Sequence, residues 1–243
     1  MEIDYIEAND IKYAVKIYYE KRNNSRVSVS KKAVSIRIPI FWGRGEIFRE
    51  IVRMKQWAKN RLLENPDRFK PEVQREYHNG EVLKIENDEY KVSIELKDKK
   101  NSSAKILENN TIELSIPRKL SKETQNLHIS KLVSKCIAHK RLPKLKEKLA
   151  KLNNTHFNQK INNISFKNTS SRWGSCSRGG NINISTRLLF APDDVLEYVC
   201  IHELAHLIEH NHSRRFWALV ERVMPDYKEK ELWLKECGGS CKF

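Results

Sequence analysis

The chain has 243 residues, of which 39% are hydrophobic and 32% charged, enough for one sizeable core or a core with a smaller module. It has no apolar run near the roughly 18 residues of a membrane span, and it starts without the pattern of a secretory signal. We therefore expect a soluble, cytoplasmic protein without a membrane partner. The net charge of +15 favours anionic partners such as nucleic acid, although it is equally typical of a solvated, lysine-rich surface.

The first predicted elements are a β-hairpin and a helix. Residues 26–30 and 33–39 alternate apolar and polar side chains on either side of Lys31-Lys32, as two strands joined by a short turn do. The apolar residues of 46–63 then recur with helical spacing. We predict that this strand-hairpin and helix unit occupies residues 1–75.

A second unit of the same design follows. Residues 90–96 and 111–117 alternate as two further strands, and Ser121 precedes another helical pattern. Both units run strand, strand, Ile-Pro, helix, which indicates an internal duplication. We predict that residues 76–160 form this second strand-hairpin with its helix, after a junction marked by Pro66, Asp67 and Pro71.

The second helix is the most basic part of the chain. Residues 118–151 contain eleven Lys or Arg and two Asp or Glu, so this tract is the predicted contact surface if nucleic acid is bound. It could equally be a solvated face whose long side chains cover the core. Pro143 is expected to break or kink the helix.

The last predicted domain, residues 161–243, has a different character. Residues 161–166 and 181–185 are predicted strands on either side of a polar, glycine-containing loop, residues 168–180. A helix should follow, with Asp194 as its N-cap in a capping box. This helix is apolar almost all round, which predicts that it is buried.

Two histidines and a glutamate interrupt the apolar surface of this helix. His202 and His206 lie four residues apart, so both imidazoles project from one face and can reach one cation. Glu203 lies beside them, placed to hold a water. This is the His-Glu-x-x-His arrangement of zinc hydrolases. The alternative is a buried helix whose two histidines simply have hydrogen-bond partners in the core. Packing alone, however, gives no reason for two histidines and a glutamate on an otherwise apolar helix.

A catalytic zinc usually takes three protein ligands and keeps one position open. The candidates for the third ligand are Glu209, His210, His212 and Glu221. His210 continues the four-residue spacing, but it lies about 12 Å along the helix axis from His202. Three such ligands on one straight helix cannot converge on a single ion.

The end of the helix decides among the remaining candidates. Asn211 suits the left-handed conformation that ends a helix, and Ser213 suits the N-cap of the next one. His212 would then lie in the turn, free to reach the metal. We predict His212 as the third ligand, with Glu221 as the alternative.

Further motifs surround these residues: Ser171-Arg-Trp-Gly-Ser-Cys176, Gly180-Asn-Ile-Asn, Ala191-Pro, Tyr198-Val, Asn211-His-Ser213, Phe216-Trp-Ala-Leu-Val-Glu221 and Met224-Pro-Asp-Tyr227. Together with the histidine motif they resemble the YgjP-like metallopeptidase-domain family, a relative of the SprT-like and Spartan-type zinc proteases. The resemblance implies an α+β fold with a minimal zincin-like core, a small sheet plus the active-site helix, preceded by a basic strand-helix region. It also implies zinc held by His202, His206 and His212, with Glu203 as general base.

These inferences predict a zinc metallopeptidase acting on proteins or peptides. Zinc would acidify a water, and Glu203 would take its proton and pass it to the leaving amine. Strand 181–185 could offer an edge for an extended substrate. One alternative is a nucleic-acid-associated module, or a protease recruited by DNA, that uses residues 118–151. Another is a structural zinc site completed by Cys237 or Cys241.

Two further roles stay open in the sequence. Tyr198, Tyr227 and Arg172 are candidate donors to the oxyanion, and no pattern ranks them. Trp173 can shape the cleft or fill the core below the metal, and we favour the core.

Overall fold

The computed structural model describes residues 1–30, 33–69 and 75–243. The turn predicted at Lys31-Lys32 and Pro71 of the predicted junction lie outside the described residues, whereas Pro66 and Asp67 of that junction lie in a short described helix, Pro66–Phe69.

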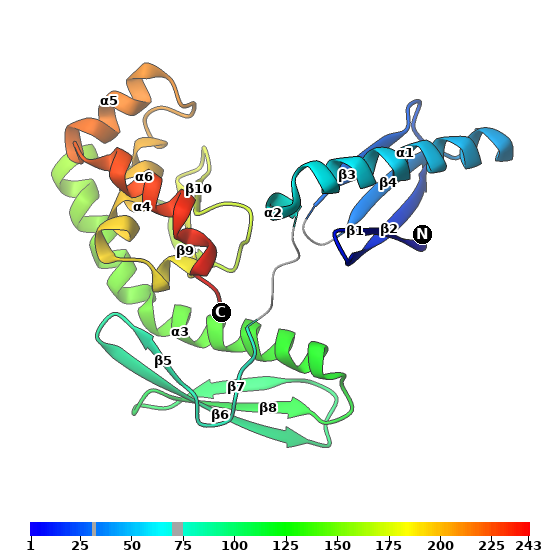
Figure 1. The fold of residues 1–243 in the computed structure, drawn as a ribbon. Coiled ribbons are helices and arrows are strands. Elements are labelled where there is room, and N and C mark those ends of the chain that lie inside the picture. The colour runs from blue at the N-terminus through cyan, green and yellow to red at the C-terminus, as the bar shows by residue number, and fades with distance from the viewer. Residues whose placement is uncertain (31–32, 70–74) are drawn as a thin grey trace. The chain divides into compact units, whose positions relative to one another are not determined.

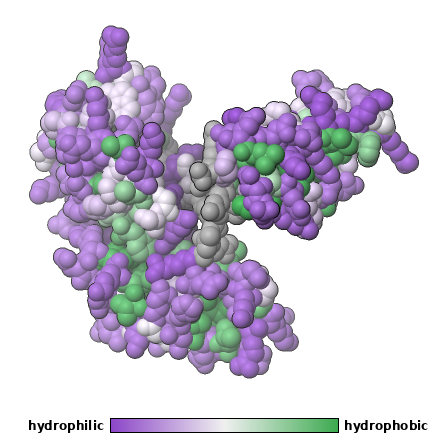
Figure 2. Space-filling view, in the orientation of Figure 1, coloured by the Kyte–Doolittle hydropathy of each residue, from purple (hydrophilic) through white to green (hydrophobic). Residues whose placement is uncertain are grey.

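The chain divides into two compact units, residues 1–73 and 74–243 (Figure 1). Each unit is described by itself. The second unit contains both of the domains predicted over residues 76–160 and 161–243, whose separation stays a prediction. Hydrophilic residues cover most of the face seen in Figure 2, in keeping with the high net charge.

The first unit is one four-stranded sheet covered by a helix. Its strand order is β1-β2-β4-β3, and β3 pairs antiparallel with β4, which confirms the predicted hairpin. Met54, Ala58 and Leu62 bury one side of α1 in the core of this unit, as the helical spacing predicts. The elements are β1 (Glu2–Ala8), β2 (Ile11–Glu20), β3 (Arg26–Val29), β4 (Val34–Pro39), α1 (Arg44–Glu64) and α2 (Pro66–Phe69).

The second unit begins with another four-stranded sheet, in the order β5-β6-β8-β7, followed by a long helix. The hairpin predicted between residues 90–96 and 111–117 is wrong, because β6 and β8 pair in parallel. The connection between them contains β7, a strand of four residues that itself forms a hairpin with β8. The elements are β5 (Val82–Ile85), β6 (Asp88–Lys97), β7 (Ser103–Ile106), β8 (Thr111–Pro117) and α3 (Lys122–Leu152).

The two four-stranded sheets have the same topology. In each, two antiparallel pairs are joined by one parallel pair between the central strands. In each, an Ile-Pro sequence ends the last strand and a helix follows. A common topology of this kind is what an internal duplication produces.

The helix α3 joins this sheet to the rest of the second unit. The Ser121 side chain accepts from the Thr124 amide and caps its N-terminus. The helix is not broken at Pro143, and its ribbon bends along its length (Figure 1). A bend is the milder consequence of a proline within a helix.

Part of the basic tract in α3 is neutralised by carboxylates. Arg141 is 8% exposed and holds the end of β5 through the Ile85 carbonyl. The ion pairs are Arg141 with Glu86 and Asp88, Lys144 with Glu86, and Lys148 with Asp193 and Glu197. These three basic residues therefore attach α3 to its neighbours instead of forming a free polyanion-binding surface.

The remainder of the second unit is a three-stranded sheet with three further helices. Its strand order is β10-β11-β9. The helix α4 starts at Asp193 with Pro192 as its N-cap, so the capping box predicted at Asp194 is wrong. The Asp194 carboxylate does accept from a backbone amide at the helix start, that of Val195 at 2.9 Å, and it also pairs with Lys230. The elements are η1 (Asn153–Phe157), β9 (Asn163–Lys167), β10 (Gly174–Cys176), β11 (Asn181–Ser185), η2 (Thr186–Phe190), α4 (Asp193–Ala205), α5 (Arg214–Val223), α6 (Tyr227–Glu236) and η3 (Gly238–Ser240).

The predicted α+β class, with a small sheet beside the histidine-bearing helix, is confirmed. The helix α4 is buried on most sides, against β10, β11, α3, α5 and α6. Among the described helices, none has both the length and the apolar character needed to cross a membrane.

Candidate metal centre

The chain reverses direction just after α4. The helix ends at Ala205, with His206 as its C-cap, which is earlier than the sequence predicts. Asn211 does not adopt the predicted left-handed conformation; its side-chain oxygen accepts from the Ser213 amide at 3.0 Å. The Ser213 hydroxyl in turn accepts from the Phe216 amide and caps α5, which confirms its predicted role.

This turn brings three histidines together. One side-chain nitrogen from each of His202, His206 and His212 lies within 4.8 Å of the other two. The Nε2 atoms of His202 and His212 are 3.1 Å apart. Zinc binds imidazole nitrogen at about 2.0–2.1 Å, so three such atoms can surround one ion with small adjustments. Of the other candidates in the described chain, Glu209, His210 and Glu221 do not belong to this cluster.

Two neighbours orient these rings. Phe216 is fully buried, and its ring centroid lies 4.5–4.8 Å from those of all three histidines. Phe216 therefore forms an apolar contact surface shared by the three imidazole rings. The His206 Nδ1 atom lies 3.1 Å from the Glu209 carbonyl oxygen. Since a carbonyl only accepts, Nδ1 carries the proton and Nε2 keeps its lone pair.

The surroundings keep the His202 and His206 imidazoles neutral. Burial, and then the nearby His206 and His212, lower the pKa of His202 to about 3. Burial is also the main cause that lowers the pKa of His206. Neutral imidazole is the form that binds a metal, so the cluster has the donor set that suits a borderline cation such as zinc.

Glu203 lies beside this cluster as a buried carboxylate. It is 4% exposed, and its Oε2 atom has no hydrogen-bond partner among the described residues. Burial raises the pKa of Glu203 to about 8, while the positive charge of Arg172 acts in the opposite direction. A buried carboxylate without a donor is costly. A water shared with a cation on the histidines would satisfy it, so the residues present fit a catalytic metal site.

A glycine allows the sheet to approach this carboxylate. A Cβ atom at Gly174 would lie 2.3 Å from Glu203 Oε1 and 2.7 Å from its Cδ. No side chain fits into that space without a shift of Glu203 or of β10. The glycine of the Arg-Trp-Gly-Ser-Cys motif is therefore required by the close packing of β10 on α4.

We expect Gly174→Ala to disturb the centre. The added methyl group should displace the Glu203 carboxylate or β10, lowering the free energy of unfolding by about 1–3 kcal/mol and reducing any metal-dependent activity. Gly179→Ala is the matched control, because its Cβ would meet only ordinary contacts, the nearest at 3.6 Å. Urea unfolding of both variants measures the effect, and equal stability of the two would contradict this account of Gly174.

The strand next to Glu203 is a free sheet edge. Residues 181–185 do not offer the edge that the sequence allowed, because β11 is an interior strand paired on both sides. The Ser185 amide donates to the Trp173 carbonyl and the Ser177 amide to the Asn181 carbonyl. In this antiparallel register, alternate residues bond to the neighbour. The backbone groups of Gly174 and Cys176 therefore point away from β11.

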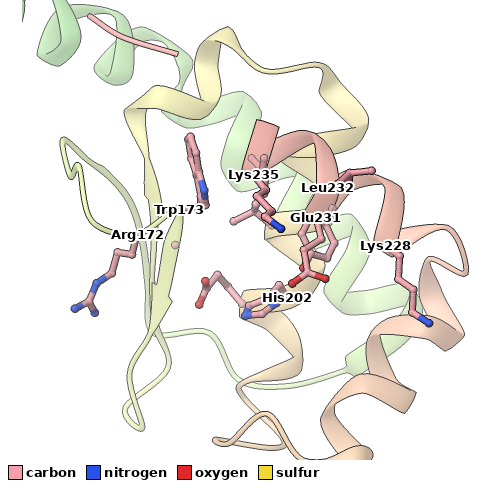
Figure 3. A pocket seen from close by; sticks show the side chains of 12 residues that line it. Arg172, Trp173, His202, Lys228, Glu231, Leu232 and Lys235 are labelled. Atoms are coloured by element: carbon pink, nitrogen blue, oxygen red, sulfur yellow. The ribbon is translucent and has the colours of Figure 1, made fainter. Parts of the chain in front are cut away.

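A pocket of about 860 Å³ opens between β10, α4 and α6. Its lining includes Trp173, His202 and Glu203, together with residues of α6 that carried no sequence signal, Lys228, Glu231, Leu232 and Lys235. Figure 3 shows Glu231 and Lys235 extending from α6 toward the side of His202, whereas the guanidinium of Arg172 points away. The helical repeat of α6 indicates which of its residues face outward, but not which part of the protein they face. Their place in this pocket therefore depends on tertiary packing.

This geometry bears on the roles that the sequence left open for Tyr198, Tyr227 and Trp173. Tyr198 lines the pocket and Tyr227 does not; the Tyr227 ring is instead stacked between Tyr198 and Trp217. Trp173 both lines the pocket and packs on the core. The Arg187 guanidinium lies 4.0 Å from the Trp173 ring centroid.

The cysteines do not join the histidine cluster. Burial, and then the charge of Glu203, raise the pKa of Cys176 to about 11, which keeps its thiol protonated at neutral pH. Within the described residues, neither Cys237 nor Cys241 belongs to a group able to hold a metal. Cys241 is instead buried at 1% exposure, and its carbonyl accepts from Arg187. The C-terminal segment is therefore attached to the core.

Comparisons with known proteins identify a family. The family model described as YgjP-like, metallopeptidase domain, matches residues 23–237. A curated protein of Escherichia coli (strain K12), named UTP pyrophosphatase, is 36% identical over 59 residues, which is 23% of this chain and 35% of that protein. The chain therefore spans about a third of the curated relative that it matches.

Two solved structures are also similar to part of the chain. The metallopeptidase zymogen abylysin of Pyrococcus abyssi is 25% identical, with a TM-score of 0.35, over 38% of this chain and 94% of that one. The metallopeptidase zymogen jannalysin of Methanocaldococcus jannaschii is 20% identical, with a TM-score of 0.34, over the same shares of the two chains.

Proposed function

The chain belongs to the YgjP-like metallopeptidase-domain family, and from this premise we propose that it is a zinc-dependent peptidase. One observation carries the proposal: three histidines converge beside a buried carboxylate whose Oε2 atom lacks a partner in the described structure. His202, His206 and His212 would hold the ion. When bound there, zinc supplies a Lewis acid that polarises a carbonyl and lowers the pKa of a water.

Glu203 carries the proton transfers. Its carboxylate accepts a proton from the attacking water and donates it to the nitrogen of the leaving amine. The low exposure of Glu203 excludes bulk water, so the carboxylate stays a strong acceptor. His206 keeps its ligand nitrogen unprotonated through the hydrogen bond to the Glu209 carbonyl.

The free edge of β10 would bind the peptide. An extended substrate adding to this edge would hydrogen-bond to the outward backbone groups of Gly174 and Cys176. Because Gly174 is packed against Glu203, a peptide bonded there passes beside the carboxylate. The adjacent pocket would accept one substrate side chain between Trp173 and Leu232.

A second candidate is hydrolysis of a phosphoanhydride bond in a nucleoside triphosphate. The name of the Escherichia coli relative introduces this candidate. The specific observation in its favour is that Lys228 and Lys235 line the pocket beside Glu203. Cations at such a site could hold phosphate oxygens. The same metal and carboxylate could activate the attacking water.

Zinc-loaded protein should be incubated separately with a fluorescence-quenched peptide library and with UTP. We expect peptide cleavage that a chelator abolishes and that added zinc restores, because the ion provides the Lewis acid. Pyrophosphate release from UTP without peptide cleavage would support the second candidate in place of the first. Absence of both reactions in protein that holds one zinc would contradict the proposal of a hydrolase.

A role in binding nucleic acid through residues 118–151 stays a prediction. The ion pairs of Arg141, Lys144 and Lys148 reduce the basic charge that this tract presents. No exposed cluster of aromatic residues accompanies the tract in the described structure, although such residues commonly stack on single-stranded bases.

A further inference from the structure

A second large groove, of about 800 Å³, lies in residues 74–243 apart from the histidine cluster. One wall is β7, the floor is the middle of α3, and the other wall includes Ser165 and Phe166 of β9. Both strands are at the ends of their sheets, since the strand orders are β5-β6-β8-β7 and β10-β11-β9. The groove therefore runs between two sheet edges.

The β7 edge presents unpaired backbone groups to this groove. The Leu107 amide donates to the Thr111 carbonyl at 2.8 Å, which fixes the phase of the antiparallel ladder with β8. Because alternate residues bond to the neighbouring strand, the amide and carbonyl of Ala104 and of Ile106 point away from β8. Such an edge can pair with another extended segment.

The charged side chains that line the groove are all basic. Its lining contains Lys105, Lys131, Lys135 and His139 and no Asp or Glu. Lys105 pairs with Glu113 at 2.8 Å. Lys131 and Lys135 lie one turn apart on α3, are exposed, and make no ion pair within the described part of the chain. These two lysines are thus the uncompensated cations of the groove.

The base of the groove is apolar. Ala104, Ile106, Leu132, Cys136 and Phe166 are partly buried there. Phe166 is the aromatic residue of the lining, so the described groove lacks the series of rings on which successive bases of a single strand stack. Backbone donors and acceptors, an apolar base and two cations suit an extended peptide better than a nucleic acid.

We propose that this groove binds an extended acidic segment of a partner protein, which adds as a strand to the free edge of β7. The main chain of the segment pairs with Ala104 and Ile106, and its carboxylates reach Lys131 and Lys135. The site is separate from the histidine cluster. It holds a partner through main-chain hydrogen bonds and ionic contacts, whether or not that partner is cleaved.

The test uses the whole chain carrying Glu203→Gln, so that the probe is not cut. The probe is a fluorescent peptide of roughly eight residues, the length of an ordinary strand, with alternating Glu and Val. We expect saturable binding by fluorescence anisotropy, and much weaker binding of the counterpart in which Lys replaces Glu, because the lysines of the groove attract carboxylates.

Two pairs of variants separate charge from backbone pairing. Lys131→Glu with Lys135→Glu should weaken binding at least about tenfold, whereas Lys122→Glu with Lys146→Glu, the same charge change outside the groove lining, should alter it less than about twofold. Ala104→Pro removes an outward amide without a ladder bond to β8 and should also weaken binding about tenfold. Ala104→Ser keeps the amide and should not.

Three outcomes would overturn the proposal. The first is a probe that does not bind the chain. The second is equal weakening by the two charge-reversal pairs, which would mean that only the overall field acts. The third is a single-stranded oligonucleotide that binds more tightly than the peptide and is unaffected by Ala104→Pro, which would assign the groove to nucleic acid. Circular dichroism of each variant shows that its fold is kept.

Discussion

Glu203→Gln is expected to abolish most of the turnover while leaving the metal in place. An amide of the same shape cannot take the proton of the attacking water, and loss of a general base costs about 100- to 10,000-fold in kcat. The three histidines are unchanged, so the zinc content should stay at one ion per chain. Steady-state cleavage of the quenched peptide and metal analysis of the same samples measure the two quantities.

The variant also tests whether Glu203 has a structural role. It replaces a buried carboxylate by a neutral side chain at a position where Oε2 lacks a described partner, so the metal-free chain should be no less stable than the original. Wild-type kcat in the variant would remove Glu203 from the chemistry. Loss of zinc together with activity would make the carboxylate a metal ligand and not a base.

The second large effect concerns the third ligand. His212→Ala should weaken zinc binding by more than the roughly 10- to 100-fold that follows loss of an outer-shell partner, because it removes one of three nitrogen ligands. Glu221→Ala and His210→Ala are the controls, since both residues are exposed and lie outside the cluster. Competition with a chromogenic chelator gives the three affinities.

The opposite ranking would change the assignment of the site. If Glu221→Ala released zinc and His212→Ala retained it, the carboxylate on α5 would be the ligand and the turn would have a different conformation with metal bound. Among these three variants, peptide cleavage should follow zinc content, because all three keep Glu203 and differ only in whether the ion is held.

The two effects predicted for Glu203→Gln and His212→Ala both depend on residues that lie close together in the sequence. His202 and His206 share a face because of the four-residue repeat of one helix, and His212 follows after a single turn capped by Ser213. Helical spacing and capping depend on neighbouring residues alone. The sequence therefore predicts this cluster, even though α4 ends earlier than expected and Asn211 bonds to Ser213 by its side chain.

The environment of Glu203 was not predictable in the same way. Gly174 is evident in the sequence, but its purpose is not. Only the packing of β10 on α4 shows that the absence of a Cβ atom there makes room for Glu203. Likewise, Lys228, Glu231 and Lys235 reach the pocket because α6 folds back beside α4. Nothing in the helical repeat of α6 marks these positions.

The sequence by itself determined six of the eleven described strands, the Ser213 cap and the residues of the candidate metal centre through local spacing, and the α+β class through a family resemblance. Only the tertiary structure decided that β6 and β8 pair in parallel, that β10 and not β11 is the free edge, and that β7 borders a cationic groove. Strand order and pocket walls are set by contacts between distant residues, and alternation of side chains along a strand carries no information about its neighbour.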